Sequence, residues 1–325
     1  MEDTELDILV IGGTGFIGSN LVRYLAGLGH NIKVYHREDS SLKNLDGVSY
    51  TGITGDISDE NSLRSAMEGC SAVFNLAACG SSLKKDSILR QRINVEAASL
   101  IAKTARKVDG IKLVHISSIA AIGIPERGEV ADETFQFNHH KDHYAFTKHL
   151  GEQAVLEEVK HGLDAVIACP GNVVGSHGMK ETQLNNFKNI AKGRMKVYPP
   201  GGVCITDIDD LVKGLLLCYE KGISGRRYIL GGHNVSFKEY FTEIAHATNG
   251  IPPKIPLPGF LLPLIGSCVE FAYGLLNKHT PINKDVCRMI SHNLFYSSEL
   301  AIKELGYSIS NLRDTIRKAS GAIDI

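Results

Sequence analysis

Residues 7–18 read Asp7-Ile8-Leu9-Val10-Ile11-Gly12-Gly13-Thr14-Gly15-Phe16-Ile17-Gly18, and this stretch decides the fold. Its first part is an apolar run of strand length, and a glycine-rich turn follows at once. Apolar residues then recur at helical spacing up to Gly29, at Leu21, Val22, Leu25 and Leu28. The order strand, glycine turn, helix is typical of a dinucleotide site, because the glycines allow a tight turn and close approach of a pyrophosphate. The helix N-terminus then presents free N–H groups to the phosphates, so we expect residues 12–18 to bind a dinucleotide.

The alternation of strands and helices continues to about residue 170. Apolar runs of strand length lie at 72–76, 111–116 and 164–169. This pattern predicts a parallel sheet covered on both faces. We therefore expect an α/β protein with a Rossmann-type doubly wound parallel sheet and a smaller, mostly helical C-terminal substrate lobe. The Rossmann domain is expected over 1–175 with returning segments near 203–232, and the substrate-binding lobe over 176–202 and 233–325.

Tyr144 and Lys148 are the leading catalytic candidates. They stand four residues apart in His-Tyr-Ala-Phe-Thr-Lys-His, a spacing that places both side chains on one face of a helix. A free tyrosine has a pKa of about 10 and is a poor acid–base catalyst at neutral pH. A lysine held nearby favours the phenolate, which suits the pair to proton transfer at an alcohol or carbonyl oxygen. The same spacing also arises by chance on exposed helices, so its meaning depends on the other motifs.

Ser118 supplies one of those motifs. It follows the apolar strand at 111–116, where open α/β sheets carry their ligand-binding groups. Its hydroxyl can donate a hydrogen bond to a substrate oxygen that gains negative charge in the transition state. A serine at this place is also common as a turn or cap. The glycine turn before it and the Tyr–Lys pair after it favour the catalytic interpretation.

In this order, the glycine turn, Ser118 and Tyr144-x-x-x-Lys148 resemble the extended short-chain dehydrogenase/reductase superfamily, within its NAD-dependent epimerase/dehydratase family. The resemblance covers essentially the whole chain. Shorter matching pieces are Gly55-Asp56-Ile57, Asn75-Leu76-Ala77-Ala78, Asn94-Val95, Pro170 to Gly175 and Asp207 to Leu211. Near the C-terminus, Gly225 to Gly232 and Glu304 to Tyr307 are similar to the dihydroflavonol-4-reductase-like branch, which includes 3β-hydroxysteroid dehydrogenases.

The resemblance implies an NAD(P)-dependent oxidoreductase that acts on CH–OH groups, and it implies a role for each matching residue. Tyr144 would be the acid–base residue, and Lys148 would bind the nicotinamide ribose and lower the pKa of Tyr144. Asp56 would bind the adenine amino group. The remaining cofactor contacts implied are Ile57 beside the adenine, Ala77 and Ala78 along the cofactor path, and Pro170 and Val173 beside the nicotinamide.

The second strand indicates which dinucleotide is bound. An enzyme for NAD usually ends this strand with an acidic residue that binds the ribose 2′-hydroxyl. Here His36 occupies that position and Arg37 follows. A guanidinium suits a 2′-phosphate, so we expect Arg37 to bind NADP(H). NAD(H) stays open, because Glu38 and Asp39 come next and Arg37 is alternatively a solvated side chain.

Composition limits the partners. The formal net charge is −1, which gives no reason to expect nucleic acid. Seven cysteines without a Cys-x-x-Cys pair predict reduced, mostly buried thiols, and the acidic N-terminus Met1 to Glu5 does not resemble a secretory signal. We therefore expect a cytoplasmic protein. Family analogy implies a homodimer formed through the helix after Asn94 and the helix that carries Tyr144.

Two other segments need an interpretation. Residues 258–276 are apolar with a single charge, Glu270, but prolines and glycines interrupt them. We expect one or two short helices there and no transmembrane span, and a lid or a peripheral membrane contact are alternatives. His139, His140 and His143 precede the catalytic tyrosine. We interpret them as a polar loop at the substrate entrance, and we expect no metal site.

The expected substrate class follows from one pair of positions at which this sequence differs from the nucleotide-sugar epimerases. Nucleotide-sugar epimerases of the superfamily commonly carry an Arg-Asp pair at the positions of Val203 and Cys204, and that arginine binds the diphosphate. Its absence favours an NADP(H)-dependent reductase or dehydrogenase for a small hydrophobic alcohol or carbonyl compound. A nucleotide-sugar epimerase or dehydratase with retained NAD is the first alternative. A non-catalytic NADP-binding sensor is the second.

Overall fold

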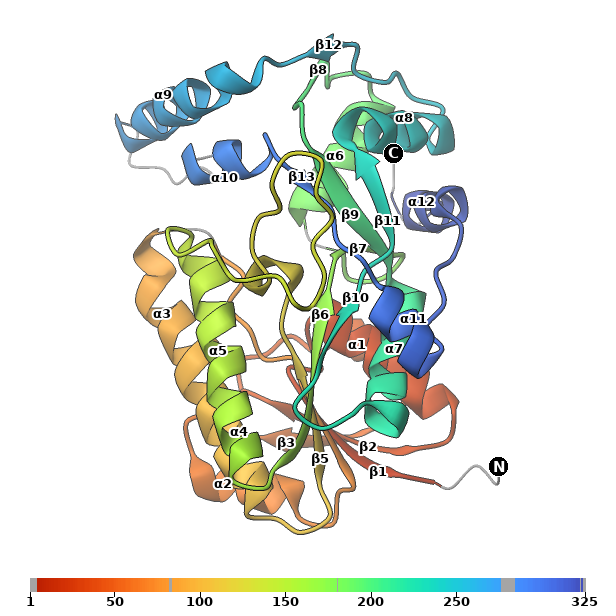
Figure 1. Ribbon diagram of the computed structural model, residues 1–325. Helices are drawn as coiled ribbons and strands as arrows, with labels where there is room; N and C mark the ends of the chain where they lie inside the picture. Colours follow the sequence, from red (N-terminus) through yellow and green to blue (C-terminus); the bar gives the residue numbers. More distant parts are fainter. Residues whose placement is uncertain (1–4, 82–83, 180, 276–283, 322, 324–325) are drawn as a thin grey trace.

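A seven-stranded sheet forms the centre of the protein (Figure 1). The computed structural model describes residues 5–81, 84–179, 181–275, 284–321 and 323. The strands lie in the order β3-β2-β1-β4-β5-β6-β10, and every neighbouring pair is parallel. Their bounds are β1 Asp7–Ile11, β2 Asn31–His36, β3 Thr51–Thr54, β4 Ala72–Asn75, β5 Lys112–Ile116, β6 Asp164–Pro170 and β10 Arg227–Leu230. The expected Rossmann-type doubly wound sheet is confirmed.

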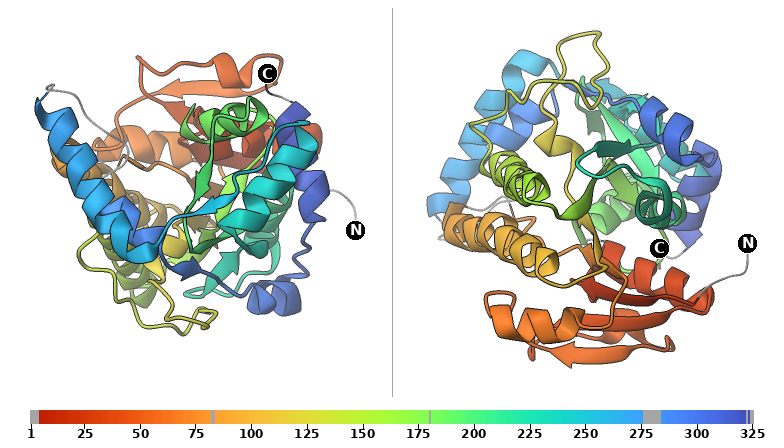
Figure 2. Two further views of the ribbon diagram at one scale, coloured as in Figure 1. Left: turned by 90° about the horizontal axis from the view of Figure 1, so that it is seen from above. Right: turned by 60° about the horizontal axis from the view of Figure 1, so that its bottom comes forward.

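Helices cover both faces of this sheet (Figure 2). One face carries α1 Phe16–Gly27, α7 Ile208–Lys221 and α11 Glu299–Leu305, and the other carries α2 Glu60–Met67, α4 Ala98–Arg106 and α5 His143–Lys160. In β1, Ile8 and Val10 belong to the hydrophobic core between the sheet and α1 and α7, whereas Leu9 and Ile11 belong to the core between the sheet and α2 and α4. Successive strand residues point to opposite faces, so a strand that is apolar at every position needs cover on both sides.

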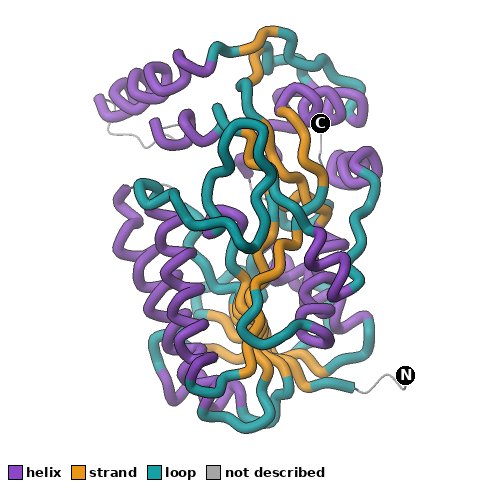
Figure 3. The backbone as a smooth tube through the Cα atoms, viewed as in Figure 1, coloured by secondary structure: helices purple, strands orange, loops and turns teal. Residues whose placement is uncertain are grey.

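The smaller lobe stands beyond the carboxyl ends of the central strands (Figure 1). It contains helices and a small sheet in which β9 pairs with β7, β11 and β13, together with the short pair β8–β12 (Figure 3). The strands are β7 Asn172–Val174, β8 Val197–Tyr198, β9 Gly202–Asp207, β11 His233–Ser236, β12 Ile255–Pro256 and β13 Asn293–Leu294. The helices are α6 Glu181–Ala191, α8 Phe237–Ala247, α9 Leu262–Leu275, α10 Lys284–Met289 and α12 Leu312–Gly321.

The segments that return to the central sheet differ in part from those expected. β10 joins the sheet beside β6, and α7 covers it. β9 instead belongs to the lobe, because the chain continues past β6 into β7 and β9 pairs with β7 there. Conversely, α11 lies in the range 233–325 that we expected to form the lobe, but it packs against α7 and β10 and so covers the central sheet.

The apolar stretch 258–276 forms short helices, as expected. Residues Gly259–Leu261 make one 3₁₀ turn, and α9 continues from it. Residue 276 and residues 1–4 lie outside the described residues. Within the part of the chain that the structure describes, no helix is both long and apolar enough to cross a bilayer.

Candidate functional site

The expected site residues gather at the carboxyl edge of the central sheet. The strand register brings the ends of four strands together: Ile11 lies beside Asn75, Asn75 beside His115, and Ile116 beside Ala168. The glycine turn therefore follows β1 next to the segment after β4, and Ser118 follows β5 next to the end of β6. Open α/β sheets bind their ligands at this edge.

The glycine turn between β1 and α1 is packed too closely for side chains. Gly12 has a φ of +81°, a left-handed conformation that favours glycine. A Cβ atom on Gly18 would lie 2.2 Å from the carbonyl oxygen of Gly12, and one on Gly12 would lie 2.8 Å from the backbone nitrogen of Ala77. Gly15 caps α1 without a side chain, so the first N–H groups of the helix remain available at the turn. The turn is therefore too tight for side chains on its inner side, and no side chain caps the helix that follows it.

Tyr144 lies in the first turn of α5, near enough to Ser118 for the serine hydroxyl to act on its pKa. Asp142 caps the helix by accepting a hydrogen bond from the backbone N–H of Ala145 at 2.7 Å, which fixes where α5 begins. Both Tyr144 and Ser118 are half-buried. Burial raises the pKa of Tyr144, and the Ser118 hydroxyl lowers it in part. The structure thus brings together a hydroxyl pair that we expected from separate segments of the sequence.

Lys148 lies one helical turn after Tyr144 and is buried, with 1% of its surface exposed. Its ammonium group donates a hydrogen bond to the carbonyl oxygen of Ile116, at 2.7 Å, at the end of β5. Burial lowers the pKa of Lys148 to about 8, against the opposing effect of the Glu152 carboxylate and the Cys169 thiol. From the sequence we expected Lys148 to lower the pKa of Tyr144. In this structure burial raises the pKa of Tyr144 and the Ser118 hydroxyl lowers it in part, while the Lys148 ammonium group is directed to a backbone carbonyl.

Glu152 is a residue that we did not single out from the sequence. It is fully buried in α5, four residues after Lys148 and eight after Tyr144, so the three side chains follow one face of the helix. Its carboxylate accepts hydrogen bonds from Cys169 Sγ and Arg227 Nη1, each at 3.4 Å. The i, i+4, i+8 spacing was visible in the sequence, but its partners lie in β6 and β10.

His115 is a second residue missed from the sequence. It is buried in β5, and its Nδ1 atom lies 3.2 Å from the side-chain nitrogen of Asn75. Its Nε2 atom is buried without a hydrogen-bond partner among the described residues. Burial lowers the pKa of His115 well below its usual value, and the charge of Lys148 adds to that effect. A neutral imidazole therefore lies beneath the catalytic candidates.

The residues expected near the adenosine half lie at the ends of β2 and β3. Arg37 is exposed and forms an ion pair with Asp39, with 3.3 Å between Nε and Oδ1. Asp56 is exposed, and its Oδ1 atom accepts hydrogen bonds from the backbone N–H and the hydroxyl of Ser58. These bonds lower the pKa of Asp56, with a smaller contribution from Arg37. The ion pair between Arg37 and Asp39 lies on the surface, with both side chains exposed.

The other expected cofactor contacts lie along the same edge. Ile57 follows β3 and Ala77 and Ala78 follow β4, and all three are at least partly exposed. Pro170 ends β6 and is buried, and Val173 is 7% exposed in β7. Thr14, Phe16 and Ile17 are half-buried around the glycine turn.

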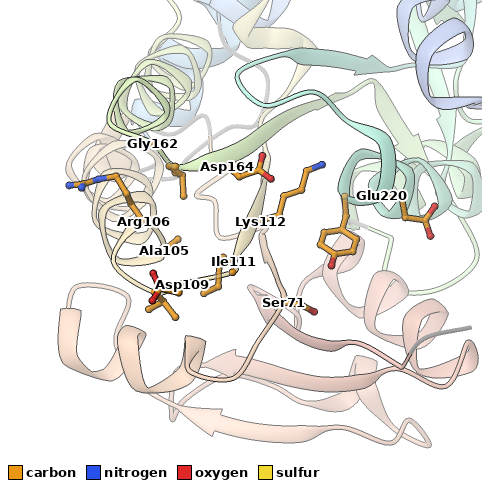
Figure 4. A pocket seen from close by; sticks show the side chains of 13 residues that line it. Ser71, Ala105, Arg106, Asp109, Ile111, Lys112, Gly162, Asp164 and Glu220 are labelled. Carbon is orange, nitrogen blue, oxygen red and sulfur yellow. The ribbon is translucent and has the colours of Figure 1, made fainter.

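A pocket of about 550 Å³ lies at the opposite end of the central sheet (Figure 4). It is lined by residues that begin β5 and β6, among them Lys112 and Asp164. Because parallel sheets bind ligands at the carboxyl ends of their strands, we do not assign this pocket to the site. In the described ranges, no group of three or more histidine, cysteine or acidic side chains is arranged to hold a metal ion.

A doubly wound parallel sheet with a glycine turn after its first strand, and a tyrosine and a lysine on one helix at the same edge, defines the class of NAD(P)-dependent oxidoreductases. The model of the NAD dependent epimerase/dehydratase family matches residues 8–231. The chain belongs to this family, and within it resembles the dihydroflavonol-reductase-like and 3β-hydroxysteroid-dehydrogenase-like proteins of the extended short-chain dehydrogenase/reductases.

Named relatives are reductases and sterol enzymes. A protein from Synechocystis sp., provisionally named dihydroflavonol 4-reductase, is 31% identical over 318 residues, covering 95% of this chain and 92% of that protein. Sterol demethylase protein B from Methylococcus capsulatus is 30% identical over 257 residues, covering 78% of each chain. The crystal structure of gox2253 superposes with a TM-score of 0.84 at 29% identity, covering 97% of each chain. The UDP-glucose 4-epimerase from Thermotoga maritima has a TM-score of 0.78 at 18% identity over 98% of each chain, a similarity of fold.

Proposed function

We propose that this protein is an NADP(H)-dependent oxidoreductase that interconverts an alcohol and a carbonyl group on a small hydrophobic substrate. The observation that carries the proposal is that Tyr144 begins α5 near enough to Ser118 for the serine hydroxyl to lower its pKa, with Lys148 one turn further along the same helix. These three side chains lie at the carboxyl edge of the central sheet, the edge at which the glycine turn also lies. They are the groups that a hydride transfer between alcohol and carbonyl requires at the oxygen atom.

The residues around the turn fit a nicotinamide dinucleotide. A Cβ atom at Gly12 or Gly18 would collide with backbone atoms, and the N-terminus of α1 presents N–H groups without a side-chain cap. This arrangement suits the pyrophosphate. Ala77 and Ala78, which follow β4, would line the rest of the dinucleotide. Pro170 at the end of β6 and Val173 in β7 would line it as well. When bound, the nicotinamide supplies or accepts the hydride.

The chain's own groups then act on the substrate oxygen. In the reductive direction Tyr144 donates its phenolic proton to the oxygen, and Ser118 donates a hydrogen bond to the negative charge that develops there. Lys148, charged below its pKa of about 8, favours the phenolate that remains. In the oxidative direction the phenolate accepts the proton from the alcohol. General acid–base catalysis of this kind contributes about 10²–10⁴-fold in rate.

Arg37 supports the choice of NADP(H). It lies just beyond the end of β2, its side chain is 66% exposed, and its partner Asp39 is 76% exposed. An ion pair this exposed contributes little, so the guanidinium can exchange it for a 2′-phosphate at small cost. We expect Arg37→Ala to raise KM for NADPH by about tenfold while KM for NADH changes little. Arg64→Ala removes a similarly exposed arginine of α2 and serves as the control.

Buried side chains support a hydrophobic substrate over a nucleotide sugar. Val203 and Cys204 occupy the positions where sugar epimerases commonly carry the Arg-Asp pair. Both are buried in β9, with 7% and 0% of their surface exposed, so neither position has room for a solvated arginine. The names of the relatives, which include a sterol demethylase protein and a 3-beta-hydroxysteroid dehydrogenase, agree with a hydrophobic substrate.

The proposal is tested by mixing the purified protein with NADPH, or separately with NADH, and a panel of hydrophobic ketones and aldehydes. We expect stoichiometric loss of the nicotinamide absorbance, faster with NADPH. If the panel consumes no cofactor, while the protein isomerises a nucleotide sugar with its cofactor retained, the epimerase alternative replaces this proposal. Cofactor binding without turnover of any substrate would instead favour the sensor.

We also propose a cytoplasmic homodimer. Ile88 and Leu89, in α3 Ser87–Gln91, are 75% and 43% exposed, and α3 leads through the π-helix Arg92–Ala97 into α4. α4 packs along α5, so the two helices and this apolar extension offer one continuous face. Light scattering on the purified protein tests the dimer, and Ile88→Ser is expected to weaken it.

A further inference from the structure

Two segments of the smaller lobe, residues 188–200 and 250–269, form one surface that we call the lobe tip (Figure 1). β8 and β12 pair here, with Val197 beside Ile255. The backbone N–H groups of Lys254 and Ile255 both donate to the carbonyl oxygen of Lys196, at 3.2 and 3.1 Å. The N–H of Leu257 donates to the carbonyl oxygen of Tyr198. The tip is therefore held as a single unit at the end of the lobe farthest from β1.

Large apolar side chains of the lobe tip point into solvent. Phe260 is 77% exposed and Leu264 is 62% exposed, and Val197, Ile251, Ile255 and Ile265 are between 37% and 57% exposed. Along the described part of α9, Leu262 and Gly266 are buried while Leu264 and Ile265 are exposed. A helix that is apolar on its exposed side as well as its buried side normally has a further apolar environment to contact.

The charges of the lobe tip have one sign. Its two segments contain five basic residues, Lys188, Lys192, Arg194, Lys196 and Lys254, and no acidic residue. All but Lys188 are exposed. The whole chain, by contrast, carries 35 basic and 36 acidic residues. A surface that exposes both apolar and basic side chains is complementary to an interface that is anionic outside and apolar inside.

We infer that the lobe tip binds the surface of an anionic phospholipid bilayer. Phe260 and Leu264 would enter the boundary between headgroups and acyl chains, and the exposed Lys192, Arg194, Lys196 and Lys254 would contact lipid phosphates. A second copy of the chain is a poorer occupant, because a two-fold contact would bring the basic patch against itself. The inference does not depend on the reaction that the protein catalyses.

Vesicle binding of the full chain tests this inference without an activity assay. The protein is sedimented with vesicles of phosphatidylcholine alone, or of phosphatidylcholine mixed with phosphatidylglycerol, at low and at raised salt. We expect binding to the mixed vesicles, little binding to the neutral ones, and loss of binding as salt rises. Phe260→Ser combined with Leu264→Ser should weaken binding by at least about tenfold. Lys196→Ser should weaken it by about fivefold.

Ile302→Ser is the matched control, because Ile302 is 45% exposed on α11, outside the lobe tip. It should bind vesicles like the unchanged protein, and all variants should keep the same melting temperature. The inference is overturned if the unchanged protein does not bind the mixed vesicles, or if the Phe260 and Leu264 variant binds as well as the control. Self-association that this variant abolishes, without any vesicle binding, would make the tip a contact between copies instead.

Discussion

Replacing Glu152 by glutamine tests whether the buried end of α5 sets the charge of Lys148. Glu152 is fully buried, and its carboxylate opposes the effect of burial on the pKa of Lys148, which stands at about 8. Glutamine keeps the shape of the side chain and removes its charge. The pKa of Lys148 should therefore fall further.

The size of this effect follows from the helix geometry. Side chains at i and i+4 stand about 6 Å apart, and two unit charges at that distance interact by about 3 kcal/mol at an effective dielectric constant of about 20. Arg227 lies 3.4 Å from the Glu152 carboxylate and partly neutralises its charge. We therefore take about half of the ~3 kcal/mol as the interaction between Glu152 and Lys148. Since one pKa unit corresponds to about 1.4 kcal/mol, the pKa of Lys148 should fall by about one unit. Near neutral pH its charged fraction should fall from about nine-tenths to about one-half.

The assay is the pH profile of kcat/KM for NADPH-dependent reduction. Lys148 is charged below its pKa and loses its charge as pH rises through it. The variant should therefore lose activity about one pH unit lower than the unchanged protein. Near neutral pH we expect about a twofold lower rate, and at more acidic pH the two rates should converge.

Glu158→Gln is the matched control for this prediction. Glu158 is also buried in α5, but it pairs with Arg106 at 2.8 Å and is not among the groups that act on Lys148. This variant should lose stability and keep the pH profile. The reasoning is refuted if Glu152→Gln lowers the melting temperature to a similar extent and leaves the profile where it was, since Glu152 would then have a structural role alone.

Further predictions concern the glycine turn and the packing beneath the lobe. Gly18→Ala should abolish cofactor binding in a fluorescence titration, because its Cβ would lie 2.2 Å from the carbonyl oxygen of Gly12, whereas Gly27→Ala at the end of the same helix meets no atom within 4 Å and should bind normally. Equal binding by both variants would contradict the tight-turn assignment. Tyr307→Phe removes the hydrogen bond from a buried hydroxyl to the carbonyl oxygen of Gly231, at 3.0 Å, and should lower the free energy of unfolding by about 1–3 kcal/mol in urea denaturation. A change below the error of the titration would show that this carbonyl finds another partner.

Much of the central sheet follows from its sequence, because β1, β4, β5 and β6 are buried on both faces and read as continuous apolar runs. β1, β4, β5 and β6 lie within a residue of the runs that we interpreted as strands. The glycine turn, Ser118 and Tyr144 could be placed at one edge because each follows a strand or begins a helix. Their order along the chain, with the family resemblance, led us to expect them at one site.

The smaller lobe was harder to predict, for a physical reason. β8, β12 and β13 have two residues each, too few for any periodicity, and their pairing depends on segments far apart in sequence. β9 is apolar like the strands of the central sheet, and only its partners place it in the lobe.

The environment of the catalytic candidates was also hidden from the sequence. Helical spacing puts Glu152 on the face of Lys148, but Arg227, which shares its carboxylate, comes 75 residues later. The balance between burial and charge at Lys148 depends on such contacts. For the same reason the sequence does not show that burial raises the pKa of Tyr144 by more than the Ser118 hydroxyl lowers it.

The central claim is that Tyr144 transfers the proton, and single-turnover reduction by Tyr144→Phe tests it most directly. Tyr219→Phe, which alters a half-buried tyrosine beside the pocket at the far end of the sheet, is the control. Cofactor binding, followed by NADPH fluorescence, should be unchanged within about twofold in both variants, because phenylalanine keeps the ring. We expect the hydride-transfer rate to fall by about 10²–10⁴-fold in Tyr144→Phe and to stay unchanged in Tyr219→Phe. A Tyr144→Phe protein that binds NADPH and reduces its substrate at the unchanged rate would contradict the account.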